Sequence, residues 1–248
     1  MSFDGMEKKL MELLSPNATT TIGEIAKSLY VSETTARRYV RQLAERGLVI
    51  RTHGGCMPSS AALDSNTPMR VRFSSEQEDK HKIASRAAQM IFSGATVFLD
   101  SSSTAFHLVP LLRPEQGLTV ITSGLKTAMA LAERNIKVIC LGGAVNPANL
   151  SMNTAFAMQS AEQFNADLFF FSGDALSDEG EVSDNSYEEC LLRRALMRRA
   201  DVSVLLIDPT KRGRRCRYNL CRLSDVDHCI TVEGDVAVEM TMERGAHS

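Results

Sequence analysis

The chain has 248 residues, of which 44% are hydrophobic, and its formal net charge is −2. This length accommodates one small and one medium domain, and the composition is that of an ordinary globular protein. Any basic surface must be local, and no apolar run approaches the ~18 residues of a membrane span. Because the N-terminus lacks the charged-then-apolar pattern of a signal segment, we expect a cytoplasmic protein.

The cysteines and histidines do not form a metal-binding pattern. The six cysteines stand at positions 56, 140, 190, 216, 221 and 229, without a CxxC pair, and several lie within apolar runs. Such cysteines are expected to be reduced thiols rather than disulfides or metal ligands. The five histidines lack the helical spacing of a metal site. We therefore expect no metal and no cofactor.

The first thirty residues predict two amphipathic helices. The first has one apolar face and ends near Pro16, because proline cannot continue a helix. Thr21 and Glu24 have the spacing of a capping box, which marks the start of the second helix. The two apolar stripes consist of Met6, Leu10, Leu13 and Leu14, and of Ile22, Ile25, Ala26 and Leu29.

The stretch from Val31 to Leu43 predicts a helix suited to a DNA major groove. Ser32 is a good N-cap, since its hydroxyl can accept a hydrogen bond from the first turn. Ala36, Val40 and Leu43 recur at helical spacing and form an apolar seam. The other side chains are short hydroxyls and guanidinium groups, which suit phosphate oxygens and base edges. Taken alone, the pattern also fits a surface helix with solvated arginines.

The neighbouring segments complete a winged helix-turn-helix. Tyr30 and Val31 form the short turn between the second and third helices. The third helix is expected to end at residues 45–47, and residues 48–51 predict a strand. A turn at residues 52–55 then indicates a small β-wing.

The charge supports a DNA-binding domain at residues 1–56. Residues 31–53 carry five arginines against two glutamates, so the basic face is local. A recognition helix of this kind would supply ~3 to 5 phosphate contacts per subunit, so binding should depend on salt. The DNA contacts are expected from Ser32, Thr34, Thr35, Arg37, Arg38, Arg41, Arg51 and His53.

Residues 57–74 predict a linker, and residues 75–248 predict an α/β domain. Apolar runs of strand length stand at 95–100, 118–122, 136–141, 167–172, 202–208 and 228–232. Helical segments are expected at 83–91, 104–113, 125–134, 154–164 and 187–200. This alternation predicts a parallel sheet with helices on both of its faces.

The predicted strands end in small and polar residues, at the edge where such folds bind ligands. The first strand is followed by Ser102, Ser103 and Thr104, directly before a helix. Their hydroxyls and backbone N–H groups suit a phosphate. Lys211, after the fifth strand, can supply a cation. Each loop alone could be an ordinary turn, but five loops at one edge predict a ligand site.

The remaining strand ends suit a polyol. Asp100 and Asp174 can accept hydrogen bonds from sugar hydroxyls, while glycines let the backbone approach a ligand. Arg193 and Arg194 could reach the same edge or lie on a solvated helix face. The basic loop 211–217 could be solvated, contact the ligand or touch DNA. The expected effector-binding residues are Asp100, Ser101, Ser102, Ser103, Thr104, Thr122, Ser123, Gly142, Gly143, Gly173, Asp174, Arg193 and Lys211.

Two sets of motifs carry a family resemblance. The first set is Ser32-Glu33-Thr34-Thr35-Ala36-Arg37-Arg38, followed by Gly47-Leu48 and His53-Gly54-Gly55. The second is Phe98-Leu99-Asp100-Ser101 with Thr104, then Leu141-Gly142-Gly143, Asp167, and Asp208 with Lys211. In residues 6–55 and 73–232, these motifs resemble the DeoR family of bacterial transcriptional regulators. The resemblance implies a sensor fold like that of ribose phosphate isomerase and a phosphorylated sugar as effector.

The leading hypothesis is a transcriptional repressor of carbohydrate-metabolism genes whose operator binding responds to a sugar phosphate. Repression is what the resemblance implies, and effector and operator affinities would be coupled reciprocally. One recognition helix reads only a few base pairs, so we expect a homodimer or tetramer on double-stranded DNA. No membrane partner is expected.

Two other functions compete with this hypothesis. A sugar-phosphate isomerase or deaminase with a DNA-binding head would need a carboxylate base and a second acid/base group. The available carboxylates are Asp100, Asp174, Glu181 and Asp184, but the acid/base constellation of those enzymes is not evident, so no catalytic residue is predicted. An architectural DNA-binding protein would leave the polar strand ends unexplained.

Overall fold

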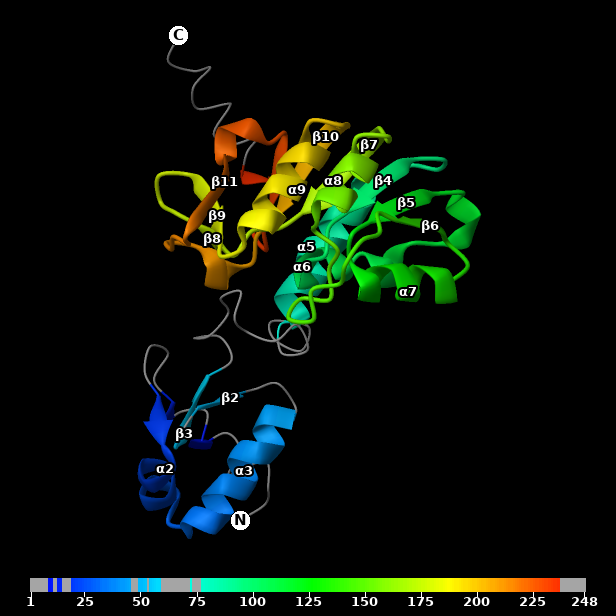
Figure 1. The fold of residues 1–248 in the computed structure, drawn as a ribbon. Helices are drawn as coiled ribbons and strands as arrows, with labels where there is room; N and C mark the ends of the chain where they lie inside the picture. Colours follow the sequence, from blue (N-terminus) through cyan, green and yellow to red (C-terminus); the bar gives the residue numbers. More distant parts are fainter. Residues whose placement is uncertain are drawn as a thin grey trace. The chain divides into compact units, whose positions relative to one another are not determined.

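The computed structural model describes residues 9–10, 13–14, 19–45, 49–52, 54–58, 72 and 77–236. It divides the chain into two compact units, Met1–Glu76 and Gln77–Ser248 (Figure 1). Of the sequence predictions, Met6, Pro16, residues 46–48, His53 and nearly all of the linker 57–74 lie outside the described residues. Within the described ranges, no helix has the length and apolar character needed to cross a membrane.

The first unit contains the predicted helix-turn-helix, formed by α2 (Ile22–Leu29) and α3 (Glu33–Glu45). The capping box is present, because the Thr21 hydroxyl accepts from the Glu24 N–H while the Glu24 carboxylate accepts from the Thr21 N–H at 2.8 Å. The predicted apolar positions of both helices, with Leu10 and Leu14, are buried and form one core, whereas Leu13 is 40% exposed.

The predicted wing is a hairpin of β2 (Val49–Thr52) and β3 (Gly55–Pro58). A strand that the sequence did not predict, β1 (Thr20–Thr21), pairs with the outer side of β3, giving the antiparallel order β1-β3-β2. This pairing brings the Thr20 carbonyl so close that a Cβ at Gly55 would lie 2.2 Å from its oxygen. Gly55 is therefore required by a close backbone approach.

The second unit is built on a six-stranded parallel sheet with strand order β12-β10-β7-β4-β5-β6. Its strands are β4 (Thr96–Leu99), β5 (Thr119–Thr122), β6 (Lys137–Cys140), β7 (Ala166–Phe171), β10 (Ala200–Leu206) and β12 (His228–Ile230). All six strands fall within two residues of the predicted bounds. The predicted parallel α/β architecture is thus confirmed.

Helices cover both faces of this sheet, as predicted (Figure 1). One face carries α5 (Gln77–Ala87), α6 (Ser103–Phe106) and α7 (Leu125–Glu133), and the other carries α8 (Ala155–Ala161) and α9 (Tyr187–Met197). Side chains of β4 alternate between the two cores, with Val97 and Leu99 on one side and Phe98 on the other. The inner strands β4, β5 and β7 are therefore buried on both faces, whereas the edge strand β6 is partly exposed.

The helix predicted over residues 104–113 is shorter than expected. The α-helix α6 ends at Phe106, and a separate 3₁₀ turn, η3 (Val109–Leu111), follows. The cause is Pro110, because a proline in a helix removes an N–H and clashes with the carbonyl four residues earlier, which here belongs to Phe106. The other 3₁₀ turns are η2 (Ala88–Met90), η4 (Pro114–Gln116), η5 (Pro209–Lys211) and η6 (Leu223–Asp225).

A small antiparallel sheet was not predicted. Its order is β11-β9-β8, from β8 (Ala175–Leu176), β9 (Glu181–Asp184) and β11 (Tyr218–Arg222). It packs beside α9 and contributes to the same core as that helix. This sheet brings Asp184 next to the carboxyl ends of the large sheet.

Candidate DNA-binding and effector-binding sites

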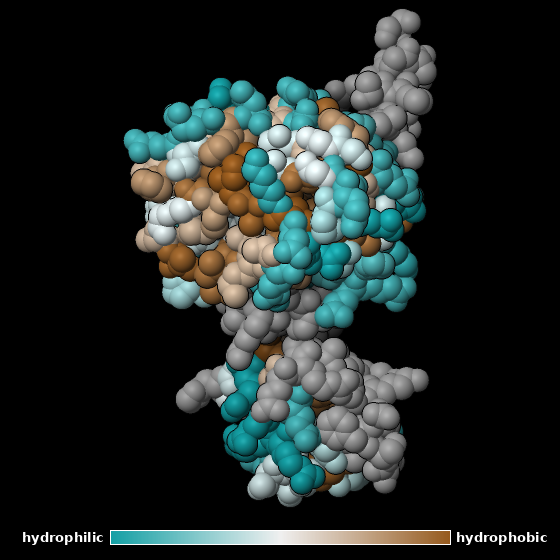
Figure 2. All heavy atoms as spheres, turned by 90° about the vertical axis from the view of Figure 1, so that its right-hand side faces the viewer, coloured by the Kyte–Doolittle hydropathy of each residue, from teal (hydrophilic) through white to brown (hydrophobic). Residues whose placement is uncertain are grey.

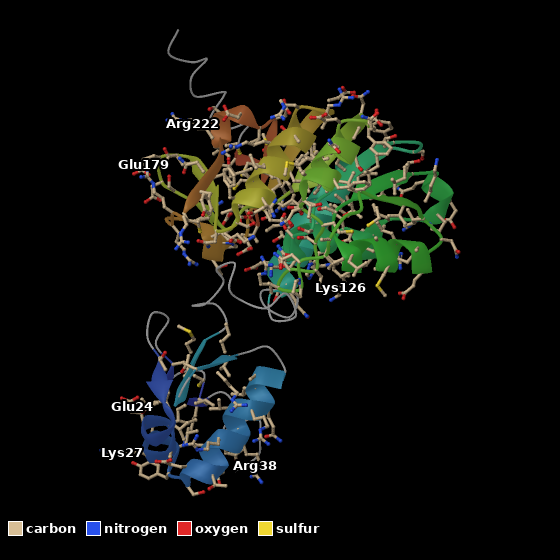
Figure 3. All side chains as sticks on the ribbon, in the orientation of Figure 1. Glu24, Lys27, Arg38, Lys126, Glu179 and Arg222 are labelled. Carbon is tan, nitrogen blue, oxygen red and sulfur yellow. The ribbon has the colours of Figure 1, made fainter. Side chains whose placement is uncertain are left out.

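The helix α3 presents one continuous polar stripe. Four exposed residues follow the i, i+3, i+4, i+7 spacing of one helix face, namely Thr34, Arg37, Arg38 and Arg41. The opposite face is the buried seam predicted from the sequence. Figure 2 shows hydrophilic surface on the described part of this unit, and Figure 3 shows Arg38 on the outer side of α3. The stripe is therefore available to DNA.

Local contacts hold the N-terminus of α3 and two of its arginine side chains in place. The Ser32 hydroxyl accepts from the Thr35 N–H at 3.2 Å, so the predicted N-cap is formed. The Arg37 guanidinium lies 3.5 Å from the Glu33 carboxylate, and the Arg38 guanidinium lies 5.6 Å from the centre of the Tyr39 ring. Such exposed pairs contribute little stability, so they can be exchanged for DNA contacts.

A hollow of about 380 Å³ separates α3 from the wing. Arg37 of α3 and Arg51 of β2 both line it, and Arg51 is exposed. The other lining residues are Ile22, Val40, Thr52, Gly54 and Gly55. Two guanidinium groups from different elements at one concave surface suit a DNA phosphate.

In the second unit, Lys211 joins three of the loops that follow the sheet strands. Its Nζ donates to the Ser172 hydroxyl at 2.8 Å and to the Thr104 hydroxyl at 3.4 Å, and it lies 3.5 Å from the Asp208 carboxylate. Burial alone would raise the pKa of the Asp208 carboxyl, but the charge of Lys211 and a hydrogen bond from Thr210 hold that pKa below its usual range. At this end of the sheet edge, the Lys211 ammonium group is therefore flanked by hydroxyl groups.

Asp100 ties the first strand end to its neighbours. Its Oδ1 accepts from the N–H of Ser102 at 2.9 Å and from the hydroxyl of Ser102 at 2.5 Å. Its Oδ2 accepts from the Ser172 N–H at 3.1 Å and from the Arg193 Nε at 2.9 Å. Both carboxylate oxygens therefore already accept hydrogen bonds from the protein.

Arg193 is buried at the centre of three carboxylates, with only 5% of its surface exposed. Its guanidinium nitrogens lie 2.9 Å from Asp100, 2.7 Å from Asp184 and 3.6 Å from Glu189. Burial would lower the pKa of the guanidinium, but the three carboxylates hold that pKa above its ordinary value. The solvated-face interpretation is therefore wrong for Arg193. Arg194 instead donates to the carbonyl oxygens of Leu220 and Asn219.

Glu189 fixes a segment that the sequence analysis did not single out. Its Oε1 accepts from the Ser151 hydroxyl at 2.6 Å, from the Asn149 Nδ2 at 2.8 Å and from the Asn153 Nδ2 at 3.3 Å. The Ser101 hydroxyl donates to the same carboxylate at 3.3 Å. The only sequence signal is that three polar residues alternate at 149, 151 and 153.

The segment 146–153 also contacts the second strand end. The N–H of Met152 donates to the Ser123 carbonyl at 2.9 Å, and the N–H of Leu125 donates to the Leu150 carbonyl at 2.9 Å. The Thr122 hydroxyl accepts from the Gly124 N–H at 3.0 Å. These bonds bring the loops after β4 and β5 and the segment 146–153 together.

The other predicted site residues occupy the same edge. Gly142 and Gly143 have φ angles of +80° and +106°, and a Cβ at Gly143 would lie 2.5 Å from the Thr154 hydroxyl. Asp174, after Gly173, accepts from the N–H and the side-chain amide of Asn185, each at 3.3 Å. The edge is thus a dense polar surface built from every loop that the sequence indicated.

The basic loop 211–217 forms surface ion pairs. Arg212 lies 3.1 Å from Glu233, and Arg215 lies 3.1 Å from Glu179 and 3.0 Å from Glu181. Figure 3 labels Glu179 on the outer part of this region. Two of the arginines are therefore engaged with carboxylates on the protein surface.

No metal site is evident in the described ranges, where no group of three or more His, Cys, Asp or Glu side chains could hold an ion. All six cysteines are free thiols. Burial raises the pKa of the Cys56 thiol to about 11 and that of Cys229 to about 12. Thiols of this kind stay protonated and unreactive at neutral pH.

A winged helix-turn-helix with an arginine stripe, joined to an α/β unit with a polar strand edge, defines a two-domain DNA-binding transcriptional regulator. The family models agree with both halves. A DeoR-like helix-turn-helix domain matches residues 7–60, and a DeoR C-terminal sensor domain matches residues 75–233. The chain belongs to the DeoR family, and operator DNA is its partner.

Two relatives match almost the whole chain. The HTH-type transcriptional regulator GolR of Listeria innocua is 33% identical over 226 residues, which are 91% of this chain and 89% of that protein. The glycerol-3-phosphate regulon repressor of Escherichia coli is 27% identical over 224 residues, 90% of this chain and 88% of that protein. Both are named as regulators of transcription.

A ribose phosphate isomerase is among the solved structures to which the chain is similar. Ribose 5-phosphate isomerase A from Methanocaldococcus jannaschii superposes with a TM-score of 0.42 and 16% sequence identity. The match covers 56% of this chain and 55% of the isomerase.

Proposed function

We propose that this regulator is a cytoplasmic repressor of carbohydrate-metabolism genes whose operator binding is modulated by a phosphorylated sugar at the strand edge of the sensor unit. The observation that carries the proposal is the position of Lys211, whose Nζ lies between the hydroxyls of Ser172 and Thr104. Ligands of parallel α/β sheets bind at this carboxyl edge. A lysine with adjacent hydroxyls is a donor set that suits a phosphate.

The phosphate end of the proposed site comprises Ser103, Thr104 and Lys211. The Lys211 side chain is only 12% exposed, so its charge acts in a poorly solvated environment, where electrostatic attraction is stronger than in water. Asp208 partly balances this charge when no ligand is bound. A phosphate oxygen would take the place of the Asp208 carboxylate as the partner of Nζ.

The polyol end comprises Asp174, Thr122, Ser123 and the backbone of the glycine loops. Asp174 accepts two hydrogen bonds of 3.3 Å from Asn185, which are long enough to be replaced by those of a ligand hydroxyl. The glycines at 142, 143 and 173 let these loops pack closely against the protein, because a Cβ at each would lie 3.2 Å, 2.5 Å and 2.7 Å from Phe156, Thr154 and Val182. The name of the Escherichia coli relative, a glycerol-3-phosphate regulon repressor, supports a small phosphorylated polyol as effector.

Asp100, Ser101, Ser102 and Arg193 support the site in this proposal by holding its loops. Both oxygens of Asp100 and the charge of Arg193 are satisfied within the protein. Groups engaged in this way order the surrounding loops in advance of binding, which lowers the entropy cost of ligand capture.

Coupling to DNA would pass through the first helix of the sensor unit. The helix α5 packs against α6, which follows directly from the loop at Ser102. A ligand held by Ser103 and Thr104 would therefore act on the helix that comes next to the linker in sequence. In a homodimer or tetramer, the same change would alter the spacing of two DNA-binding units and hence their fit to two half-sites.

Of the four carboxylates that an isomerase or deaminase could use, three are engaged in ion pairs, and the fourth, Asp174, accepts hydrogen bonds from Asn185. Asp100 and Asp184 pair with Arg193, and Glu181 pairs with Arg215. Carboxylates held in ion pairs are poor general bases. The geometry therefore favours a sensor over an enzyme.

Replacing Lys211 with methionine is expected to remove the preference for phosphorylated ligands. The measurement is a thermal-shift screen of the full chain against sugar phosphates and the matching free sugars. A ligand at 100 times its Kd stabilises the folded state by about 2.7 kcal/mol. We expect a rise in melting temperature with one sugar phosphate, none with its free sugar, and none in Lys211→Met.

Lys137→Met is the matched control, because Lys137 is exposed at the opposite end of the sheet, where β6 begins. It should respond like the unmodified chain. An unchanged response of Lys211→Met to the sugar phosphate would refute the assignment of the phosphate end.

A further inference from the structure

Tyr30 combines a strained backbone with an almost fully exposed aromatic side chain. It is the residue after α2, with φ 55° and ψ 44°, which is the left-handed region. Only two other non-glycine residues in the described ranges, Asn135 and Leu150, have positive φ. The residue as a whole is 95% exposed. Tyrosine pays a steric penalty for this conformation that glycine and asparagine largely avoid.

The turn explains the backbone conformation but not the side chain. The N–H of Tyr30 points to the carbonyls of Ala26 and Lys27, and the N–H of Val31 donates to Ala26 at 3.0 Å. This left-handed cap reverses the chain between α2 and α3, and asparagine or glycine would form it at lower cost. Among the described residues, no hydrogen bond or ring contact involves the Tyr30 side chain, so folding does not account for its presence.

The position of Tyr30 relates the side chain to DNA. It stands two residues before Ser32, the N-cap of α3, and three residues after the exposed Lys27 (Figure 3). In helix-turn-helix proteins the recognition helix enters the major groove with its N-terminal end, while the preceding helix crosses the backbone. The turn between these helices therefore lies at the rim of the groove, beside the phosphates.

We propose that Tyr30 binds the operator backbone, and that its phenol hydroxyl donates a hydrogen bond to a phosphate oxygen at the rim of the groove occupied by α3. Tyrosine hydroxyls are among the groups that contact DNA phosphates. The exposed tyrosine ring extends farther from the turn than the shorter side chain of asparagine would. Strain retained at an exposed position is typical of a functional residue.

The proposal predicts opposite effects of one substitution on stability and on DNA binding. Tyr30→Asn should raise the melting temperature, because asparagine tolerates the left-handed conformation better. It should also weaken DNA binding by about tenfold, the value of a hydrogen bond to a charged group. Tyr30→Phe should leave the melting temperature unchanged and weaken DNA binding by a similar factor.

Two DNA probes locate the contact, with fluorescence anisotropy of the full chain as the measurement. A phosphate contact carries no sequence information, so a random-sequence duplex and an operator selected from a random pool should lose affinity equally. The slope of affinity against salt should not change, because tyrosine is neutral and releases no counterion. Tyr187→Phe, at a half-exposed tyrosine of the sensor unit, should behave like the unmodified chain.

Three results would overturn the proposal. DNA affinity that is unchanged in both Tyr30 variants would exclude the contact. A loss in Tyr30→Asn without a loss in Tyr30→Phe would assign the contact to the ring and not to the hydroxyl. A lower melting temperature of Tyr30→Asn would show that the side chain stabilises the fold.

Discussion

Replacing Arg193 with methionine is expected to cost about 3 to 5 kcal/mol of folding free energy, the usual effect of breaking a buried ion pair. The substitution keeps the volume of the side chain but removes the only positive charge that the structure pairs directly with Asp100, Asp184 and Glu189 among the described residues. Three buried carboxylates would then repel one another. For a domain of this size, the loss corresponds to a fall in melting temperature of roughly 10 °C.

One further variant separates charge from geometry, and another is a surface control. Arg193→Lys keeps the charge but not the planar fork that reaches three partners, so it should recover only part of the loss. Arg198→Met, at an exposed arginine just after the same helix, should melt within about 1 °C of the unmodified chain, as is usual for surface positions. Thermal unfolding followed by circular dichroism gives these values. A melting temperature of Arg193→Met close to that of the unmodified chain would contradict the central role of this residue.

Removing Arg37 or Arg38 is expected to weaken operator binding by about 1 to 3 kcal/mol for each side chain that reads a base. Both arginines lie on the exposed stripe of α3, and their contacts with Glu33 and Tyr39 are surface contacts. The melting temperatures of Arg37→Ala and Arg38→Ala should therefore change little. Response to the sugar phosphate should also be retained.

Comparison of two DNAs distinguishes base reading from phosphate binding. If the removed arginine reads a base, the variant should lose affinity for the selected operator but not for a random duplex. If the arginine binds a phosphate, the variant should lose affinity for both DNAs. Arg222→Ala, at an exposed arginine of the sensor unit (Figure 3), is the control for loss of one positive charge. Should both α3 variants bind the operator normally, the placement of the recognition helix would be wrong.

Local patterns predicted most of the fold. The Thr21–Glu24 capping box, the Ser32 cap and the 3.6-residue periodicity of α2 and α3 depend on residues close in sequence. The inner parallel strands were visible as apolar runs because their side chains are buried on both faces. The wing was predicted from its turn, but β1 was not, since two residues give no periodic signal.

The features that were missed depend on contacts between distant residues. The pair Arg193-Arg194 lies on adjacent helix positions, which point in different directions, and only the positions of Asp100 and Asp184 show which one is buried. Glu189 likewise sits in a helix, where glutamate is normally exposed, and its amide and hydroxyl partners are 36 to 88 residues away. In the β8-β9-β11 sheet, β8 has only two residues, and β9 and β11 mix polar with apolar residues, so none of them stands out as an apolar run.

The most direct test of the account is titration of the protein–operator complex with a panel of sugar phosphates and the matching free sugars, followed by fluorescence anisotropy. We expect one sugar phosphate to shift operator affinity by about 5- to 150-fold, the usual range of allosteric coupling, while its free sugar has no effect. The same ligand should leave the operator affinity of Lys211→Met unchanged. Operator affinity that stays constant with every sugar phosphate that binds the protein would contradict the account.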